Sequence, residues 1–372
     1  MTITAITMPK WGLTMTEGKV IGWLKEPGDN IAAGDELLEI ETSKITNVFE
    51  APEPGVLRRV VAAEGTTLPI GGLLAIVAPD SVPEADIDAF VAGFKAPEPA
   101  AQDMSGEAAA PHDIEAGGKR LRVLDIGAGD PLPVVLIHGF GADLNAWMFT
   151  QPALAEQRRA VALDLPGHGG SEKAVGPGDL ATLSGAVAEA LDVLGIERAH
   201  LVGHSMGGAI ALDVAARQPD RVASLTLIAP AGLGPEINAA FIDGFIHAQR
   251  RREAQEVLAL LVHDPALVSR TMVEDVLRYK RLDGATAALE TIAGAWFPNG
   301  NQAVELTAAL AGLQASVQIV WGRDDRILPV AHGKAFAGRV PLHILDGAGH
   351  LPHMEKAGEV NRLIARFIDA AP

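Results

Sequence analysis

Short, mainly apolar runs alternate with helix-like stretches through the C-terminal two-thirds of the chain. The runs occupy residues 134–137, 160–163, 199–202, 225–228 and 317–320. Strands that are buried on both faces have this continuous apolar character, and helices cover both sides of the parallel sheets they form. The pattern therefore predicts an α/β domain with a mostly parallel sheet, whose site lies at the carboxyl ends of the strands.

The first 80 residues carry a different pattern, two similar segments of short alternating runs. Residues 27–40 align with residues 64–77 at a shift of 37 without a gap, which matches Gly28 with Gly65 and Gly34 with Gly71. Glycine permits the positive φ that tight turns need, and alternating apolar residues suit half-buried strands. The repeat predicts a small all-β barrel or sandwich with quasi-twofold symmetry.

The stretch between these two patterns has no sustained hydrophobic period. From Glu84 to Gly118 it holds eight acids and one base, Lys95, with several prolines and many alanines. Proline and like charges extend a chain, so this composition indicates a linker, although residues 87–94 could form a short docked helix. We expect a small domain over residues 1–80, an acidic linker over 81–118 and a large domain over 119–372.

Composition excludes several classes of protein. The formal net charge is −17, which disfavours nucleic acid as a partner, and the absence of cysteine excludes disulfides and cysteine nucleophiles. No apolar run approaches the roughly 18 residues of a membrane span, and the N-terminus lacks the pattern of a signal peptide. We expect a cytoplasmic protein without a membrane or nucleic-acid partner.

Lys44 lies between the strand-like residues 36–41 and 47–50, at the expected tip of a hairpin. The surrounding Gly-Asp and Glu-Thr-x-Lys pattern resembles the lipoyl domains of 2-oxo-acid dehydrogenase complexes. In that family the tip lysine carries lipoate in amide linkage, and Lys44 is the matching position. Ser43 replaces the usual aspartate, and neither Ser43 nor Ile45 is the methionine that flanks the lysine of biotinyl domains. A plain solvated lysine is the alternative.

The pentapeptide Gly-His-Ser-Met-Gly at 203–207 follows one of the apolar runs and precedes a helical pattern. It matches the Gly-x-Ser-x-Gly turn, in which glycines allow a tight strand-to-helix turn that exposes the serine. Ser205 is the candidate nucleophile. The amides of Met206 and of Phe140, in the loop 138–141, are the candidate donors to an oxyanion.

A serine hydroxyl needs a base, and the base needs a carboxylate to orient it. His350 follows a strand-like run, and Asp324 and Asp325 follow another. The order Ser205, acid, His350 and the whole of about 120–372 resemble the α/β-hydrolase superfamily. That resemblance implies Asp325 rather than Asp324 as the acid, because of its spacing from the neighbouring glycine and proline.

The remaining histidines and the region 232–300 are not expected to carry the reaction. We expect His168 and His204 to be structural or pocket-lining and His353 to be incidental, and we expect no metal site. By resemblance, residues 232–300 form a cap over the site. Its basic clusters at 249–252 and 278–281 could hold the phosphates of coenzyme A, but a solvated helix face explains them as well.

A lipoyl-type carrier joined to an acyl-transfer site suggests that both domains act in one acyl-transfer reaction. The pairing resembles the dihydrolipoyllysine acetyltransferase components of acetoin dehydrogenase complexes. The resemblance implies acetyl transfer from dihydrolipoyl-Lys44 to coenzyme A, with a thiamine-diphosphate-dependent dehydrogenase and a dihydrolipoyl dehydrogenase as partners. A hydrolase of ester or carbon–carbon bonds with an attached carrier, and a catalytically idle scaffold, are the alternatives. The sequence leaves open whether transfer uses a Ser205 ester or runs directly between thiols with His350 as base.

Overall fold

A computed structural model describes residues 3–9, 11, 15–42, 46–95 and 110–371 of the chain. The chain forms two compact units, Met1–Ala108 and Ala109–Pro372, each with its own core. Lys44 and its two neighbours lie outside the described residues. Among the helices in the described part of the chain, none has the length and apolar character needed to cross a bilayer.

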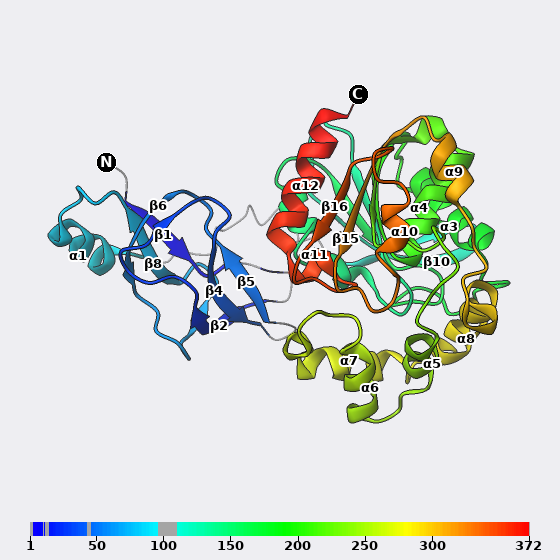
Figure 1. Ribbon diagram of the computed structural model, residues 1–372, viewed down its shortest axis with the longest axis horizontal. Helices are drawn as coiled ribbons and strands as arrows, with labels where there is room; N and C mark the ends of the chain where they lie inside the picture. The colour runs from blue at the N-terminus through cyan, green and yellow to red at the C-terminus, as the bar shows by residue number, and fades with distance from the viewer. Residues whose placement is uncertain (1–2, 10, 12–14, 43–45, 96–109, 372) are drawn as a thin grey trace. The chain divides into compact units, whose positions relative to one another are not determined.

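The small unit consists of two four-stranded antiparallel sheets (Figure 1). Strands β1, β8, β6 and β3 form one sheet in that order, and strands β5, β4, β2 and β7 form the other. The strands are β1 Thr4–Thr7, β2 Glu17–Trp23, β3 Asn30–Ile31, β4 Glu36–Glu41, β5 Thr46–Glu50, β6 Gly55–Val60, β7 Thr67–Pro69 and β8 Leu73–Ala78.

The sequence repeat is visible as a structural repeat. Strands β4 and β8 differ by the same shift of 37 residues, and each is a central strand of its own sheet. The matched glycines also agree in conformation, with φ of +103° at Gly28 and +83° at Gly65, and +91° at Gly34 and +77° at Gly71. These are turn conformations that other residues adopt at a cost. The small all-β fold with its quasi-twofold repeat is therefore confirmed.

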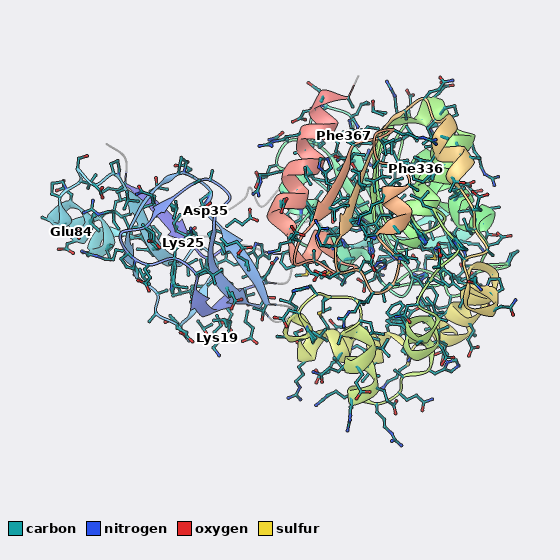
Figure 2. All side chains as sticks on the ribbon, viewed as in Figure 1. Lys19, Lys25, Asp35, Glu84, Phe336 and Phe367 are labelled. Atoms are coloured by element: carbon teal, nitrogen blue, oxygen red, sulfur yellow. The ribbon has the colours of Figure 1, made fainter. Side chains whose placement is uncertain are left out.

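The core of the small unit lies between its two sheets. Its buried members are apolar residues from both halves of the repeat, including Val20, Leu37, Ile40, Leu57 and Leu74. Polar contacts are peripheral, such as the ion pair of 3.3 Å between Lys25 and Asp35 (Figure 2). Burial of alternate strand residues, rather than surface charge, therefore holds the two sheets together.

Helix α1 (Glu84–Gly93) belongs to the small unit, and it is the short docked helix that residues 87–94 were noted as able to form within the expected linker. Its Ile87 is fully buried in a cluster with Ile76, Ala78 and Val82. Glu84, labelled in Figure 2, forms ion pairs with Arg58 and Arg59 of β6. The composition of residues 81–95 suggested an extended chain, but these long-range contacts stabilise a docked helix.

The large unit has one eight-stranded sheet with helices on its faces and a group of helices outside it. The strands are β9 His112–Ala116, β10 Lys119–Ile126, β11 Val134–Ile137, β12 Ala160–Leu163, β13 Ala199–His204, β14 Val222–Ile228, β15 Ser316–Gly322 and β16 Leu342–Leu345. The helices are η1 Leu144–Trp147, α2 Gln151–Ala155, α3 Leu180–Val193, α4 Met206–Arg217, η2 Pro219–Arg221, α5 Ala239–His247, α6 Arg251–Leu258, η3 Pro265–Leu267, α7 Arg270–Tyr279, α8 Ala285–Trp296, η4 Pro298–Gly300, α9 Thr307–Gly312, α10 Ala331–Lys334, α11 Pro352–Glu355 and α12 Ala357–Ala370.

The sheet order is β16, β15, β14, β13, β11, β12, β10, β9. The six strands from β16 to β12 pair in parallel, and β10 and β9 add antiparallel strands at one edge. The predicted α/β class with a mostly parallel sheet is confirmed. Strand β9 lies inside the segment that was expected to be linker, so the linker prediction is wrong there. The segment forms a strand because Ile114 and Ala116 pack against Leu121 and helix α3.

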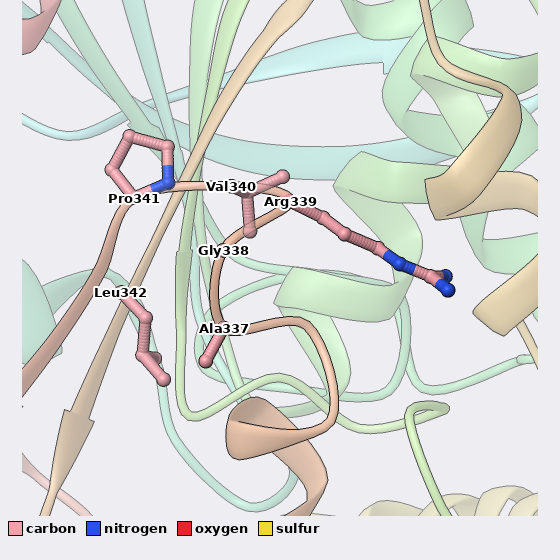
Figure 3. A pocket seen from close by; sticks show the side chains of 6 residues that line it. All are labelled: Ala337, Gly338, Arg339, Val340, Pro341 and Leu342. Carbon is pink, nitrogen blue, oxygen red and sulfur yellow. The ribbon is translucent and has the colours of Figure 1, made fainter.

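The helices α5 to α8 come between β14 and β15 in the chain and gather on one side of the large unit in Figure 1. They occupy the segment expected to form a cap. A surface pocket of about 470 Å³ is lined by residues 337–342, whose side chains are drawn in Figure 3. These residues precede or begin β16, so the pocket lies at the amino end of that strand. The predicted site residues follow the carboxyl ends of their strands, and this pocket is therefore not at the predicted site.

Candidate active site

Ser205 sits at the turn from β13 to α4 in a strained backbone conformation. Its φ is +53° and its ψ is −118°, a region that L residues rarely adopt. The turn is possible because of its glycines: a Cβ on Gly203 would lie 2.3 Å from the carbonyl oxygen of Gly207, and one on Gly207 would lie 2.2 Å from that of Ile137. The amide of Ser205 donates to Ile228 O on the neighbouring strand at 2.9 Å. Position 205 is thus fixed by backbone packing.

His350 and Asp325 form a buried pair. Nδ1 of His350 donates to Oδ2 of Asp325 at 2.8 Å, and their side chains are 3% and 0% exposed. His350 follows β16 and Asp325 follows β15, so the carboxyl ends of two neighbouring parallel strands bring the acid and the histidine together. This bond leaves Nε2 as the ring nitrogen that can accept a proton.

Asp325 is held by more than the histidine. Oδ2 also accepts from Trp321 Nε1 at 2.9 Å, and Oδ1 accepts from the amides of Ile327 and Leu328 at 2.8 and 3.0 Å. Asp324, the alternative acid, instead forms an ion pair of 2.9 Å with His263. Of the two carboxylates, it is Asp325 that can orient His350.

Ser205 and His350 form no hydrogen bond with each other in this structure. In the described part of the chain, the hydroxyl of Ser205 has no hydrogen-bond partner. The preceding residue provides the connection: Nε2 of His204 donates to the carbonyl oxygen of His350 at 2.8 Å, and the two rings are 4.7 Å apart. Bonds between nucleophile and base are often long without substrate and tighten when it binds.

The loop 138–141 passes directly beside Ser205. A Cβ on Gly139 would lie 3.1 Å from Ser205 Cβ, so only glycine lets the loop come this close. Nδ1 of His138 donates to Gly139 O at 2.8 Å and its Nε2 accepts from the amide of Leu165 at 3.0 Å, which fixes a neutral ring. Burial lowers the pKa of His138 to about 4. The amides of Phe140 and Met206 have no hydrogen-bond partner among the described residues, as donors reserved for a ligand would be.

The other histidines near the site are buried and neutral. Burial lowers the pKa of His168 and of His353 to about 3 and that of His204 well below its ordinary value. His353 lies against Trp147 and His204, with ring centroids 4.8 and 4.6 Å away. A base must gain a proton during the reaction, so these three histidines are poor candidates for that role.

Asp164 is a buried carboxylate near the site whose contacts the sequence analysis missed. It accepts from the amides of Leu144 at 2.7 Å and Gly170 at 2.6 Å, and so ties two loops to the end of β12. Burial and the nearby Asp143 raise its pKa to about 7. The sequence does hold a signal for this role. Residues 164–171 are rich in turn-forming residues, and the backbone amides of such a turn need a nearby acceptor.

The basic clusters of the expected cap are largely neutralised by neighbouring acids. Arg251 and Arg270 both contact Glu274, Arg252 contacts Glu256, and Arg278 contacts Asp275. Lys280 donates to the backbone oxygens of Phe245 and Ala248. These pairs are typical of a solvated helix face, and they leave little net charge for a phosphate.

The flanks of Lys44 are described although the residue itself is not. Strands β4 and β5 pair antiparallel, and Glu41 with Thr46 is the last pair before the connection that contains Lys44. The hairpin therefore fits the attachment of a group beyond the last paired residues of one sheet.

Comparison with known families agrees with both units. A family described as "alpha/beta hydrolase fold" matches residues 133–357, and a biotin–lipoyl family described as "Biotin-requiring enzyme" matches residues 4–77. The first match covers more than half of the chain. The large unit therefore belongs to the α/β hydrolase fold.

Two relatives match along nearly the whole chain. The dihydrolipoyllysine-residue acetyltransferase component of the acetoin cleaving system of Pseudomonas putida is 47% identical over 98% of each chain. The component of the same name from Cupriavidus necator is 44% identical over 99% of this chain and 98% of its own. The chain belongs to this family of acetyltransferase components. Its two units are thus a shared arrangement of the family and not a chance fusion.

The large unit by itself also resembles a solved structure. A meta-cleavage product hydrolase from Pseudomonas fluorescens IP01 superposes with a TM-score of 0.63 at 24% identity, covering 69% of this chain and 97% of its own. At that identity the likeness establishes the fold of the large unit.

Proposed function

We propose that this protein transfers an acetyl group from S-acetyl-dihydrolipoyl-lysine to coenzyme A, as the acetyltransferase component of an acetoin cleaving system. The carrying observation is the identity of 47% along 98% of the chain to a relative of that name, which spans both units. The buried pair of Asp325 and His350 beside the Ser205 turn supports an acyl-transfer site in the large unit.

Lys44 is the proposed attachment point of lipoate, which when bound supplies the thiol that carries the acetyl group as a thioester. The small unit fits this role because its two sheets match a biotin–lipoyl family and present a hairpin on either side of residue 44. Ser43 and Ile45 in place of methionines favour lipoate over biotin.

In the large unit, we assign Ser205 as nucleophile, His350 as base and Asp325 as the acid that orients the base. Nε2 of His350 takes the proton of the Ser205 hydroxyl, while Asp325 holds Nδ1–H and stabilises the imidazolium. The amides of Met206 and Phe140 stabilise the anionic oxygen of the tetrahedral intermediate. As the Ser205 ester forms, the bond between the acetyl carbon and the dihydrolipoyl sulfur breaks, and His350 gives its proton to that leaving thiol. The thiol of coenzyme A then attacks the ester: His350 takes the thiol proton and passes it to the departing Ser205 oxygen, which restores the serine hydroxyl.

The proposed partners follow from this chemistry. A thiamine-diphosphate-dependent dehydrogenase loads the acetyl group from acetoin, and a dihydrolipoyl dehydrogenase reoxidises the dithiol. The relatives' names place those proteins in an acetoin cleaving system, which implies further components.

The test is to incubate the lipoylated protein with acetyl-dihydrolipoamide, with and without coenzyme A, and to follow acetyl-CoA and free acetate. Acetyl-CoA formation that Ser205→Ala abolishes supports the proposal. Acetate at an equal rate with and without coenzyme A would instead establish a hydrolase, and turnover independent of Ser205 would refute the assigned nucleophile. A labelled acetyl group trapped on Ser205 would separate the ester route from direct transfer.

The carrier is tested separately by mass. Intact-mass analysis of protein made in lipoate-supplied cells should show a lipoyl adduct on the wild-type chain and none on Lys44→Ala. Lys25→Ala, on the same unit but in an ion pair with Asp35, is the matched control and should keep the adduct.

A further inference from the structure

Glu355 is a buried carboxylate that the proposed mechanism does not use. It is the last residue of the short helix α11, and only 6% of it is exposed. A carboxylate in such a place is costly unless donors surround it. Its partners therefore show what the residue does.

The partners of Glu355 are three backbone amides from two segments. Oε1 accepts from Gly349 at 2.9 Å and from Leu351 at 3.2 Å, the two residues that flank His350. Oε2 accepts from the amide of His263 at 2.6 Å. His263 lies between α6 and η3, in the segment expected to form the cap, so one carboxylate joins the histidine loop to that segment.

The cap segment 259–263, which we call the cap arm, contacts the loops of both the acid and the base. The amide of His350 donates to Leu261 O at 2.7 Å, and Arg326 donates to the carbonyl oxygens of Ala259 and Val262. A Cβ on Gly349 would lie 2.8 Å from the amide nitrogen of His263, so the two backbones are in direct contact. The arm is therefore part of the surroundings of His350.

The amide and carbonyl groups of His350 and the amides of its two neighbours are thus all engaged by other residues. Its amide is bound by the cap arm, its carbonyl oxygen by His204, and the amides on either side by Glu355. Among the described residues, the ring is held by its hydrogen bond of 2.8 Å to Asp325 and by its packing against the ring of His204. A shift of the arm would move the loop, and misplacement of a catalytic group by about 1 Å can cost a hundredfold in rate.

We infer that Glu355 is a positioning residue that locks the cap arm to the loop of His350, so that the base is oriented only while the arm is docked. The inference rests on the proposed role of His350. It makes the order of the cap arm a condition for acyl transfer, although no atom of Glu355 has to touch the substrate.

The test compares Glu355→Gln with the wild type in the full-length lipoylated protein. Glutamine keeps the size of the side chain but replaces one acceptor oxygen by a donor, so at least one of the three amides loses its partner. We expect faster hydrogen exchange at residues 259–263 and 349–351 together, and a kcat about tenfold to a hundredfold lower with KM nearly unchanged. Labelling of Ser205 by a fluorophosphonate should slow by a similar factor.

Two further variants control for misfolding. Glu359→Gln removes an exposed acid one turn further along, in α12, and should leave all three measurements unchanged. Arg326→Gln alters an exposed side chain that holds the arm from the other side, and it should speed exchange in 259–263 and slow labelling without unfolding the protein.

Wild-type rates of labelling and transfer in a folded Glu355→Gln protein would overturn the inference. So would increased exchange in only one of the two segments, because it would show that arm and loop are independent. If the wild type is labelled at Ser205 but forms no acetyl-CoA, the proposed function fails, while exchange and labelling still decide the role of Glu355.

Discussion

The carboxylate of Asp325 accepts from four donors at once: the His350 ring, the Trp321 indole and two backbone amides. Each oxygen receives two of them, so the carboxylate has little freedom to turn. The Trp321 indole comes from the strand that precedes Asp325, which places a rigid donor beneath the acid. Because both oxygens accept two hydrogen bonds each, position 325 requires both the negative charge and the shape of an aspartate.

We predict that Asp325→Asn lowers kcat by about 10³- to 10⁴-fold, since the amide nitrogen cannot accept and would favour the wrong histidine tautomer. Acetyl transfer to coenzyme A measures the effect. Asp324→Asn is the matched control, because its carboxylate pairs with the half-exposed His263, and it should retain activity within about threefold, as exposed ion pairs contribute about 0–1 kcal/mol. Equal losses in both variants would contradict the assignment of the acid.

At the scale of elements, the strand-to-helix turn at Ser205 depends on the space that glycine leaves. We predict that Gly207→Ala destabilises the protein by about 3 kcal/mol or more, because the new methyl would press on the carbonyl oxygens of Ile137 and His138. Gly185→Ala in α3 is the control: no atom lies within 4 Å of its Cβ position, and the change should stabilise by about 0.5–1 kcal/mol.

Chemical unfolding of both glycine variants gives the measurement. A Gly207→Ala protein as stable as the wild type would show that the turn can relax, and that its strain is not imposed by close packing. A destabilised Gly185→Ala protein would show that the control position is more crowded than the structure indicates.

Elements were predictable where their signal is local. The buried strands β11 to β15 appear as continuous apolar runs, and β4 and β8 appear as copies at a fixed shift. Strand β9 was placed in the linker, and residues 87–94 were noted only as able to form a short docked helix, because the stability of β9 and α1 comes from α3, Arg58 and Arg59, which are far away in the sequence. The candidate residues of the Ser205 turn and the Asp325–His350 pair carry short motifs. Glu355 carries none, since its partners are backbone amides brought together by the fold.

At the scale of the whole molecule, buried neutral histidines should make the protein sensitive to acid. Burial lowers the pKa of His138 to about 4 and the pKa values of His168 and His353 to about 3, from an ordinary 6.5. Below about pH 6.5, these histidines therefore bind protons in the unfolded chain but stay neutral in the folded chain. Each of them then lowers the free energy of unfolding by about 1.4 kcal/mol for each pH unit of acidification. Asp164 opposes this trend, because its raised pKa of about 7 makes the folded state take up a proton as the pH falls from 7 to 4.

Since the histidines outnumber the aspartate, we predict that the free energy of unfolding falls between pH 6.5 and pH 4.5. Urea unfolding at several pH values measures the slope. His353→Gln should make the slope shallower, because it removes one of these buried histidines. An identical slope for wild type and His353→Gln would show that His353 is protonated in the folded protein.

Net charge acts at the same scale. The chain carries −17, and the basic residues of α6 and α7 are paired with acids, so coenzyme A approaches a repulsive field. We predict that kcat/KM for coenzyme A rises as salt increases from about 20 to 200 mM, because screening shortens the reach of that field to about 10 Å or less. Pantetheine, which lacks the nucleotide phosphates, should show little change. A falling kcat/KM for coenzyme A would instead reveal a local cationic site.

The docking of α1 has a practical consequence for anyone who isolates the lipoyl-type unit. A fragment that stops at Ala78, the end of β8, would lack helix α1. Ile76 and Ala78 would then be exposed, and Arg58 and Arg59 would lose their ion pairs with the helix. Bare apolar patches of this kind promote self-association. A fragment that continues through Phe94 keeps the cover in place, and is the better choice for spectroscopy or for assays of enzymatic lipoylation.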